Sequence, residues 1–214
     1  MLQENKIFSK IFFWMFIGLA ITFGIGFYVS LNENMLYNIF ARYYIFFIIA
    51  ELVVVIWLSA RIYKMQPTTA KILFCLYSFI TGLTFSSIFV LYSLTSILMV
   101  FGITSVLFLI FALIGHYTKM DLTKLGTYLF MGLIGIIICS IINMFTASSS
   151  FDLIITIVAL IIFIAYIAYD VQIIKKRLNF MNEDNLAIYG ALQLYIDFIN
   201  LFLRLLRLFG RSRD

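Results

Sequence analysis

Long apolar runs alternate with short polar segments along the 214 residues of this chain. A helix that crosses the hydrocarbon core of a bilayer needs about 20 apolar residues. The pattern predicts seven such helices, over about residues 11–31, 39–63, 72–92, 95–115, 125–145, 153–174 and 186–209. The third and fourth runs are nearly continuous, and small hydroxyl residues that can cap helix ends mark the break between them. We therefore expect a single all-α transmembrane domain over residues 1–214.

The composition excludes most soluble classes of protein. Hydrophobic residues make up 64% of the chain and charged residues 12%, with a mean hydropathy of +1.09. Soluble domains carry about 25% charged residues, so this chain has too little polar surface to cover a water-soluble globule. Cys75 and Cys139 lie inside apolar runs, with neither a disulfide framework nor metal-ligand spacing. We expect an integral membrane protein without a resident cofactor.

The basic residues punctuate the apolar runs, which indicates lipid headgroups as their partner and not nucleic acid. In the predicted topology the N-terminus and the second, fourth and sixth loops hold ten of them: Lys6, Lys10, Arg61, Lys64, Lys71, Lys119, Lys124, Lys175, Lys176 and Arg177. The opposite loops hold only Arg42. The positive-inside rule then predicts a cytoplasmic N-terminus, with Pro67 and Lys175 on the same side and Ser149 outside. Seven full spans would place the basic C-terminus outside, against the rule, so its side stays open.

Three acidic residues lie within the apolar runs. Glu51 is at the midpoint of its run, Asp170 lies near the cytoplasmic end of the sixth, and Asp197 lies near the middle of the seventh. An ionisable side chain near the bilayer centre costs at least ~2.5 to 3.5 kcal/mol on insertion scales. We therefore take all three as candidates for a functional site.

The seventh predicted helix carries a polar stripe. Its members are spaced by three or four residues, which places them on one helical face: Tyr189, Gln193, Asp197, Asn200, Arg204, Arg207 and Arg211. Inside a membrane such a face must turn toward protein or water. Hydrogen bonding between helices would be the simplest role. A carboxylate within the stripe favours an ion or proton path that includes Gln193 and Asn200.

Two segments in the last third point to a family. They are residues 167–174, IAYDVQII, and residues 191–202, ALQLYIDFINLF. Together they resemble the Bax inhibitor-1 family, and especially its small bacterial YetJ-like branch. The resemblance implies seven helices with the last one surrounded by the others. It also implies a pH-sensitive calcium leak of the bacterial plasma membrane, gated by an aspartate pair that matches Asp170 and Asp197. Arg61 would match the family's latch partner, and Glu51 its buried acid.

Carboxylate and amide oxygens suit Ca²⁺, so Asp170, Asp197 and Glu51 are candidates for transient contacts with it as a permeant ion. Acidification would protonate the pair and release Arg61, so that the leak rises as pH falls. The sign stays open, because the ionised pair could itself be the cation site.

Other function classes remain. One is a non-conducting regulator of a membrane protease or another membrane partner. A proton-coupled transporter would need broken helices at the midplane, and no predicted span contains proline. An intramembrane aspartyl protease would also place two aspartates on adjacent helices, but Asp197 lies in Tyr-Ile-Asp-Phe and not Gly-x-Gly-Asp. We expect a protein that is not an enzyme.

Overall fold

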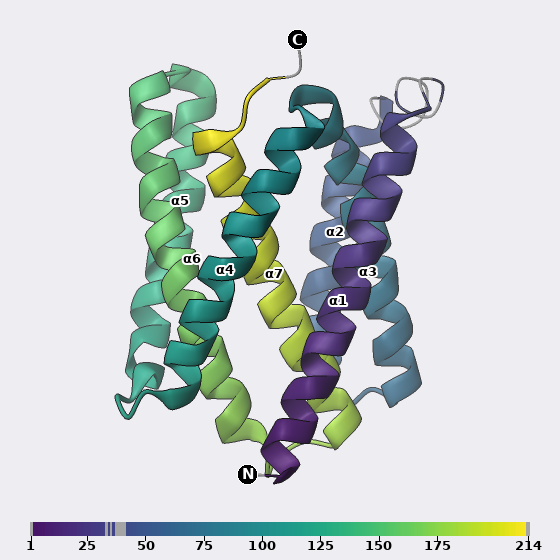
Figure 1. Cartoon of the computed structure of the whole chain (residues 1–214), viewed down its shortest axis with the longest axis vertical. Coiled ribbons are helices and arrows are strands. Elements are labelled where there is room, and N and C mark those ends of the chain that lie inside the picture. Colours follow the sequence, from purple (N-terminus) through teal and green to yellow (C-terminus); the bar gives the residue numbers. More distant parts are fainter. Residues whose placement is uncertain (1, 33, 35, 37–41, 213–214) are drawn as a thin grey trace. The chain divides into compact units, whose positions relative to one another are not determined.

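In the computed structural model of this chain, the described residues are 2–32, 34, 36 and 42–212. Within them the chain forms seven α-helices and one short 3-10 helix (Figure 1), namely α1 (Leu2–Ser30), α2 (Arg42–Arg61), α3 (Pro67–Leu91), α4 (Leu94–Tyr117), η2 (Leu122–Leu125), α5 (Gly126–Thr146), α6 (Ser149–Arg177) and α7 (Glu183–Phe209). All seven of these α-helices are long and apolar enough to cross a membrane.

Most helices extend beyond the apolar runs that predict them. α1 begins nine residues before the predicted start at residue 11 and includes Lys6 and Lys10. Pro67 lies between the second and third predicted spans, but it is the first residue of α3, where its fixed φ and missing N–H are tolerated. The predicted start of the second helix at residue 39 lies outside the described residues. Hydropathy identifies the part of a helix that lies in the hydrocarbon core of the membrane. Polar residues at the helix ends continue the helix into the membrane–water interface, where hydropathy is low.

The chain divides into two compact units. The first contains Met1–Leu94, Arg177–Tyr195 and Ser212–Asp214. The second contains Thr95–Lys176 and Ile196–Arg211. α7 therefore contributes its first half to one unit and its second half to the other.

In the first unit α3 packs against both α1 and α2. α1 and α3 approach closely at Gly26 and Gly82. A Cβ added to Gly26 would lie only 3.1 Å from the Gly82 carbonyl oxygen. The first half of α7 brings the fully buried Tyr195 against Phe74, with ring centroids 5.8 Å apart. The Tyr195 hydroxyl hydrogen-bonds to Thr22 of α1. A polar contact therefore ties α1 to α7 inside an aromatic core.

In the second unit α4 and α6 cross in direct backbone contact at Gly115. The second half of α7 packs through Phe198, whose ring lies 5.4 Å from that of Phe101 and 5.6 Å from that of Phe108, both on α4. α5 and α6 share a small apolar core that includes Ile136 and Phe163.

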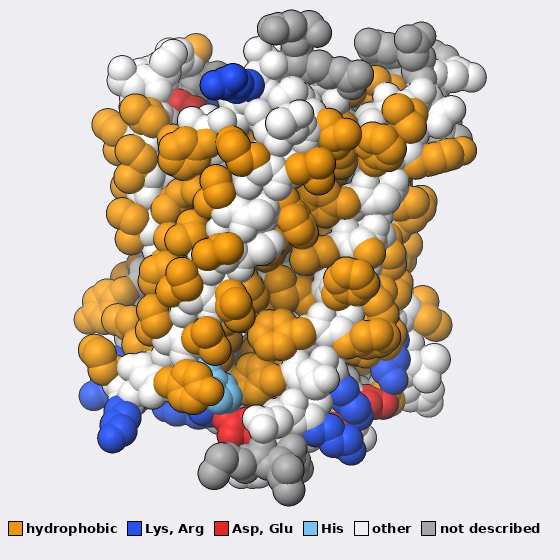
Figure 2. All heavy atoms as spheres, viewed as in Figure 1, with side chains coloured by type: hydrophobic (Ala, Val, Ile, Leu, Met, Phe, Trp, Pro, Cys, Tyr) orange, Lys and Arg blue, Asp and Glu red, His pale blue; other side chains and the backbone are white. Residues whose placement is uncertain are grey.

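Exposed and buried faces separate as expected for a membrane protein. Large hydrophobic side chains are exposed along the helices, for example Ile45 of α2 and Val106 of α4. Figure 2 shows hydrophobic side chains over the middle of the visible face, with lysine and arginine toward its ends. α7 is the most completely buried of the seven described helices. The prediction of an all-α membrane fold is confirmed, and the last helix is largely buried.

The α4–α6 crossing gives a stability prediction. A Cβ on Gly115 would lie 2.3 Å from the Ala168 carbonyl oxygen, so Gly115→Ala must push the two backbones apart. Overpacking of this kind typically costs ~1–3 kcal/mol. Thermal unfolding in detergent should show a lowered Tm. Gly102→Ala on the same helix is the matched control, because nothing lies within 4 Å of its added Cβ. Equal Tm values for the two variants would contradict the close crossing.

Candidate functional site: an intramembrane aspartate pair

Asp170 of α6 and Asp197 of α7 meet inside the second unit. Each residue is only 4% exposed, and the two side chains are hydrogen-bonded to each other. An ionised carboxylate is an acceptor only, so two carboxyl groups can bond to each other only when at least one carries a proton. The structure therefore brings together the two aspartates that the sequence singled out.

Buried apolar residues flank both aspartates along the chain, namely Ala168 and Val171 on α6 and Phe198 on α7. Asp197 Oδ2 is buried and has no hydrogen-bond partner among the described residues.

Two tyrosines of α6 lie beside the pair. Tyr166 interacts electrostatically with both carboxyl groups and Tyr169 with Asp170. Their ring centroids are 6.1 Å apart. Gly126 makes room for Tyr169, since a Cβ there would lie 2.5 Å from the tyrosine hydroxyl. The contact between Gly126 and Tyr169 could not be predicted from the sequence, because it joins segments that are distant along the chain.

The polar stripe of α7 runs from buried to exposed. Asn200 is half-buried and its Nδ2 donates to the Ile196 carbonyl oxygen at 2.9 Å. Arg207 forms an ion pair with Asp152 of α6 at 2.7 Å. The helical position predicted for Arg211 is wrong, because α7 ends at Phe209. The Arg211 backbone N–H instead donates to Ser96 Oγ at 3.1 Å.

The predicted residues of the first unit have different surroundings. Gln193 is half-buried on α7. Glu51 is half-buried on α2 and accepts hydrogen bonds from α3, from Thr81 Oγ1 at 2.8 Å and from Thr84 Oγ1 at 3.4 Å. The threonines were missed at the sequence level, although their spacing of three residues places both on one helical face.

Arg61 is the last residue of α2 and is exposed. Within its own unit it forms no ion pair with a described residue. The pairing of Arg61 with Asp170 would join the two units and stays a prediction. A second arginine, Arg177, has its own partners in the first unit: its guanidinium carbon lies 5.2 Å from the Tyr63 ring centroid and 4.5 Å from that of Tyr189.

The acidic side chains do not gather into a metal centre. In the described part of the chain, no group of three or more His, Cys, Asp or Glu residues is arranged to hold a metal ion. Contacts of Glu51, Asp170 and Asp197 with passing calcium therefore stay a prediction about transport.

Known proteins resemble the chain along nearly its whole length. The sequence model of a family described as inhibitor of apoptosis-promoting Bax1 matches residues 4–214. The inner membrane protein YbhL of Escherichia coli (strain K12) is 39% identical over 213 residues, covering 96% of this chain and 91% of that protein. A protein of Borreliella burgdorferi is 42% identical over 220 residues, covering 100% of this chain and 95% of that protein. A membrane protein of Streptococcus pyogenes serotype M1 is 33% identical over 215 residues, covering 97% and 93%.

The names of these relatives agree with the helical structure of this chain. The relatives from Escherichia coli and Streptococcus pyogenes are named as membrane proteins, and the chain forms seven apolar helices among its described residues. The resemblance first carried by two short segments around Asp170 and Asp197 thus extends over the whole chain. The chain is an integral membrane protein and belongs to the Bax inhibitor-1 family.

Proposed function

We propose that this protein is a pH-sensitive calcium leak of the bacterial plasma membrane, gated by protonation of Asp170 and Asp197. The observation that carries the proposal is the buried hydrogen bond between the two carboxyl groups. A shared proton in the low-dielectric interior of a helix bundle is an electrostatic switch, because its gain or loss changes the buried charge by one unit. The inner membrane location of the Escherichia coli relative supports the assignment to the plasma membrane.

The proposed gate uses the charge of the pair. With one shared proton the pair carries a single negative charge, which attracts Arg61 and holds the cytoplasmic end shut. A second proton neutralises the pair, and Arg61 can then extend toward the headgroups. Opening needs only a few kcal/mol of bias. In this mechanism the leak rises as pH falls.

The polar groups of the proposed pathway offer oxygen atoms as ligands, and calcium prefers oxygen ligands. Asp197 Oδ2 has no partner among the residues described, and the amide oxygen of Asn200 lies one turn further along α7. Glu51 and Gln193 are the candidates from the first unit. Their carboxylate and amide groups would favour cations over anions along the path.

Calcium flux into proteoliposomes, measured between about pH 5 and pH 8, tests this function. We expect flux that rises toward acidic pH without an imposed proton gradient. A protein that conducts no calcium at any pH would contradict the leak and favour a non-conducting regulator of a membrane protease or another partner. Uphill calcium movement driven by a proton gradient would favour a transporter. Cleavage of a helical substrate would favour an aspartyl protease.

The topology that this gate requires is tested separately by cysteine labelling. α6 runs from Ser149 to Arg177, so Ser149 and Lys175 lie at opposite ends of one helix. With Cys75 and Cys139 replaced, we expect Lys175→Cys and Pro67→Cys to react with a membrane-impermeant reagent only from the cytoplasm. Ser149→Cys should react only from outside. Reaction of Ser149→Cys from the cytoplasm alone would reverse the assignment.

A further inference from the structure

A pocket of about 380 Å³ lies in the second unit, where α4 and α6 both end. Its wall includes three lysines, one histidine and one glutamine, and a single carboxylate faces them. These residues are Lys119, Lys175, Lys176, His116, Gln172 and Asp121. None of them belongs to the aspartate pair or to the polar stripe of α7. The pocket is therefore a separate feature of the molecule.

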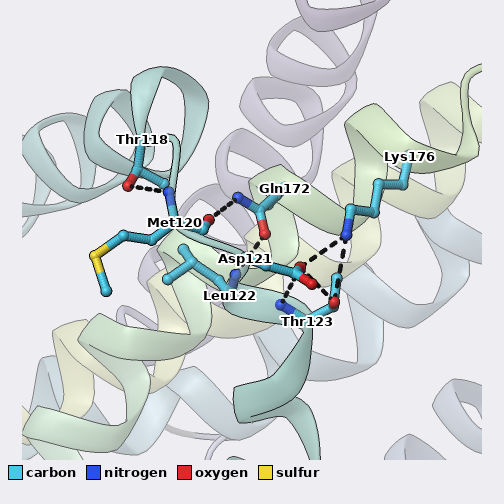
Figure 3. A network of polar contacts seen from close by, with 7 residues as sticks. All are labelled: Thr118, Met120, Asp121, Leu122, Thr123, Gln172 and Lys176. Carbon is cyan, nitrogen blue, oxygen red and sulfur yellow. Dashed lines mark hydrogen bonds and ion pairs between the residues drawn. The ribbon is translucent and has the colours of Figure 1, made fainter.

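Hydrogen bonds hold the wall of the pocket in place (Figure 3). The Gln172 amide Nε2 donates to the Met120 carbonyl oxygen, and its Oε1 accepts from the Leu122 backbone N–H, each at 2.7 Å. Asp121 Oδ1 accepts from Lys176 Nζ at 2.8 Å and from the Thr123 backbone N–H at 3.2 Å. The segment between α4 and η2 is thus fixed against α6, so the pocket is formed before any ligand arrives.

The charge of the pocket is positive at neutral pH. The hydrogen bond from Lys176, with further bonds from Thr123, lowers the pKa of Asp121 to about 2. Asp121 therefore stays ionised throughout the neutral range, and it balances one of the three lysines. Three lysines face this one carboxylate on the wall of the pocket, so the lining has more basic than acidic side chains.

Helix capping accounts for only part of this charge. Lys175 Nζ donates to the His116 carbonyl oxygen at 2.8 Å, at the end of α4, and Lys176 is held by Asp121. Lys176 Nζ also donates to Thr123 Oγ1 at 3.3 Å. Lys119 is exposed and pairs with no carboxylate in the described part of the chain. Capping gives no reason for Lys119, whereas an anionic ligand does.

The position of the pocket indicates the kind of anion. It lies between the apolar span that ends at Tyr117 and the one that begins at Leu122. Because both spans are long enough to cross a bilayer, we expect the segment between them at the level of the lipid headgroups. Met120 on its wall is 72% exposed and the adjacent Tyr117 is 75% exposed. The outer surface of α4 continues from there with exposed apolar side chains, including Ile114. A phosphate in the pocket would have acyl chains beside an apolar surface.

We propose that this pocket binds the phosphate group of an anionic membrane phospholipid. Basic pockets between transmembrane helices on the cytoplasmic side are suited to such headgroups. The lysines would pair with the phosphate oxygens, and the acyl chains would follow α4. The bound lipid would join α4, the loop and α6 at the membrane surface.

Native mass spectrometry of the detergent-purified protein tests the proposal, with dioleoylphosphatidylglycerol as the anionic probe and dioleoylphosphatidylcholine as the zwitterionic one. We expect preferential binding of phosphatidylglycerol. Each lysine near an anionic lipid surface contributes a factor of about five in affinity, so Lys119→Gln should weaken binding about five-fold and Lys119→Glu more. Lys124→Gln is the matched control, because Lys124 is exposed on η2 but does not line the pocket.

Four results would overturn the proposal. They are unchanged phosphatidylglycerol binding by Lys119→Glu, an equal loss in Lys124→Gln, equal binding of the two phospholipids, and binding of free glycerol 3-phosphate as tight as that of phosphatidylglycerol. The last would make the pocket a site for a soluble phosphate. A helical circular dichroism spectrum like that of the unsubstituted protein shows that each variant is folded.

Discussion

Asp170→Asn and Asp197→Asn should each abolish most of the pH dependence of calcium flux. An amide can still hydrogen-bond to the remaining carboxyl group, so the contact between α6 and α7 is kept while the shared titration is lost. One linked proton changes an equilibrium by up to about tenfold per pH unit. The unsubstituted protein should therefore show a steep flux profile between about pH 5 and pH 8, and the variants a nearly flat one.

Asp152→Asn is the control for this experiment. Asp152 also lies on α6, but it pairs with Arg207 and does not contact the aspartate pair. Its substitution should leave the steep profile in place. If Asp170→Asn and Asp197→Asn both keep the normal pH dependence, the pair is not the sensor.

Arg61→Ala should shift the flux profile toward higher pH, because the pair loses the positive charge that favours its ionised form in the proposed closed state. Removing an opposite charge at close range moves a titration by about 1 to 3 pH units. Arg61→Lys should restore only part of the shift, since an ammonium lacks the planar fork that holds a carboxylate by two hydrogen bonds. Flux recorded across the same pH range gives the midpoint of each variant.

Lys64→Ala is the matched substitution for the latch experiment. Lys64 is exposed and lies three residues after Arg61, so it tests the effect of removing any positive charge from that segment. Its midpoint should stay close to that of the unsubstituted protein. A midpoint unchanged by Arg61→Ala, or moved equally by both substitutions, would remove Arg61 from the gate while leaving the aspartate pair as the sensor.

The seven helices and the two candidate aspartates, Asp170 and Asp197, could be predicted from the sequence because each depends on a local pattern. Seven apolar runs indicate seven helices, and helical spacing places Asp197 and Asn200 on one face of α7. The costs of burying Asp170 and Asp197 mark both as unusual without any structure. The likeness to a known family then adds the pairing of these two residues.

What the sequence could not provide are contacts between segments that are distant along the chain. Glu51 accepts from Thr81 and Thr84, thirty or more residues away, and no periodic pattern links them. The packing of Arg177 against Tyr63 depends in the same way on how helix ends meet. The basic pocket could not be predicted, because lysines at helix ends are common at the membrane surface. It depends on the hydrogen bonds of Gln172, which hold the loop against α6.

In the proposed gate, one protonation event both neutralises the aspartate pair and opens the leak. Infrared titration of the protonated carboxyl band, recorded on the same proteoliposomes as calcium flux, tests this most directly. We expect the band and the flux to share one midpoint, and the band to change in Asp170→Asn and in Asp197→Asn. A carboxyl band that is unchanged in both variants, or a midpoint far from that of the flux, would contradict it.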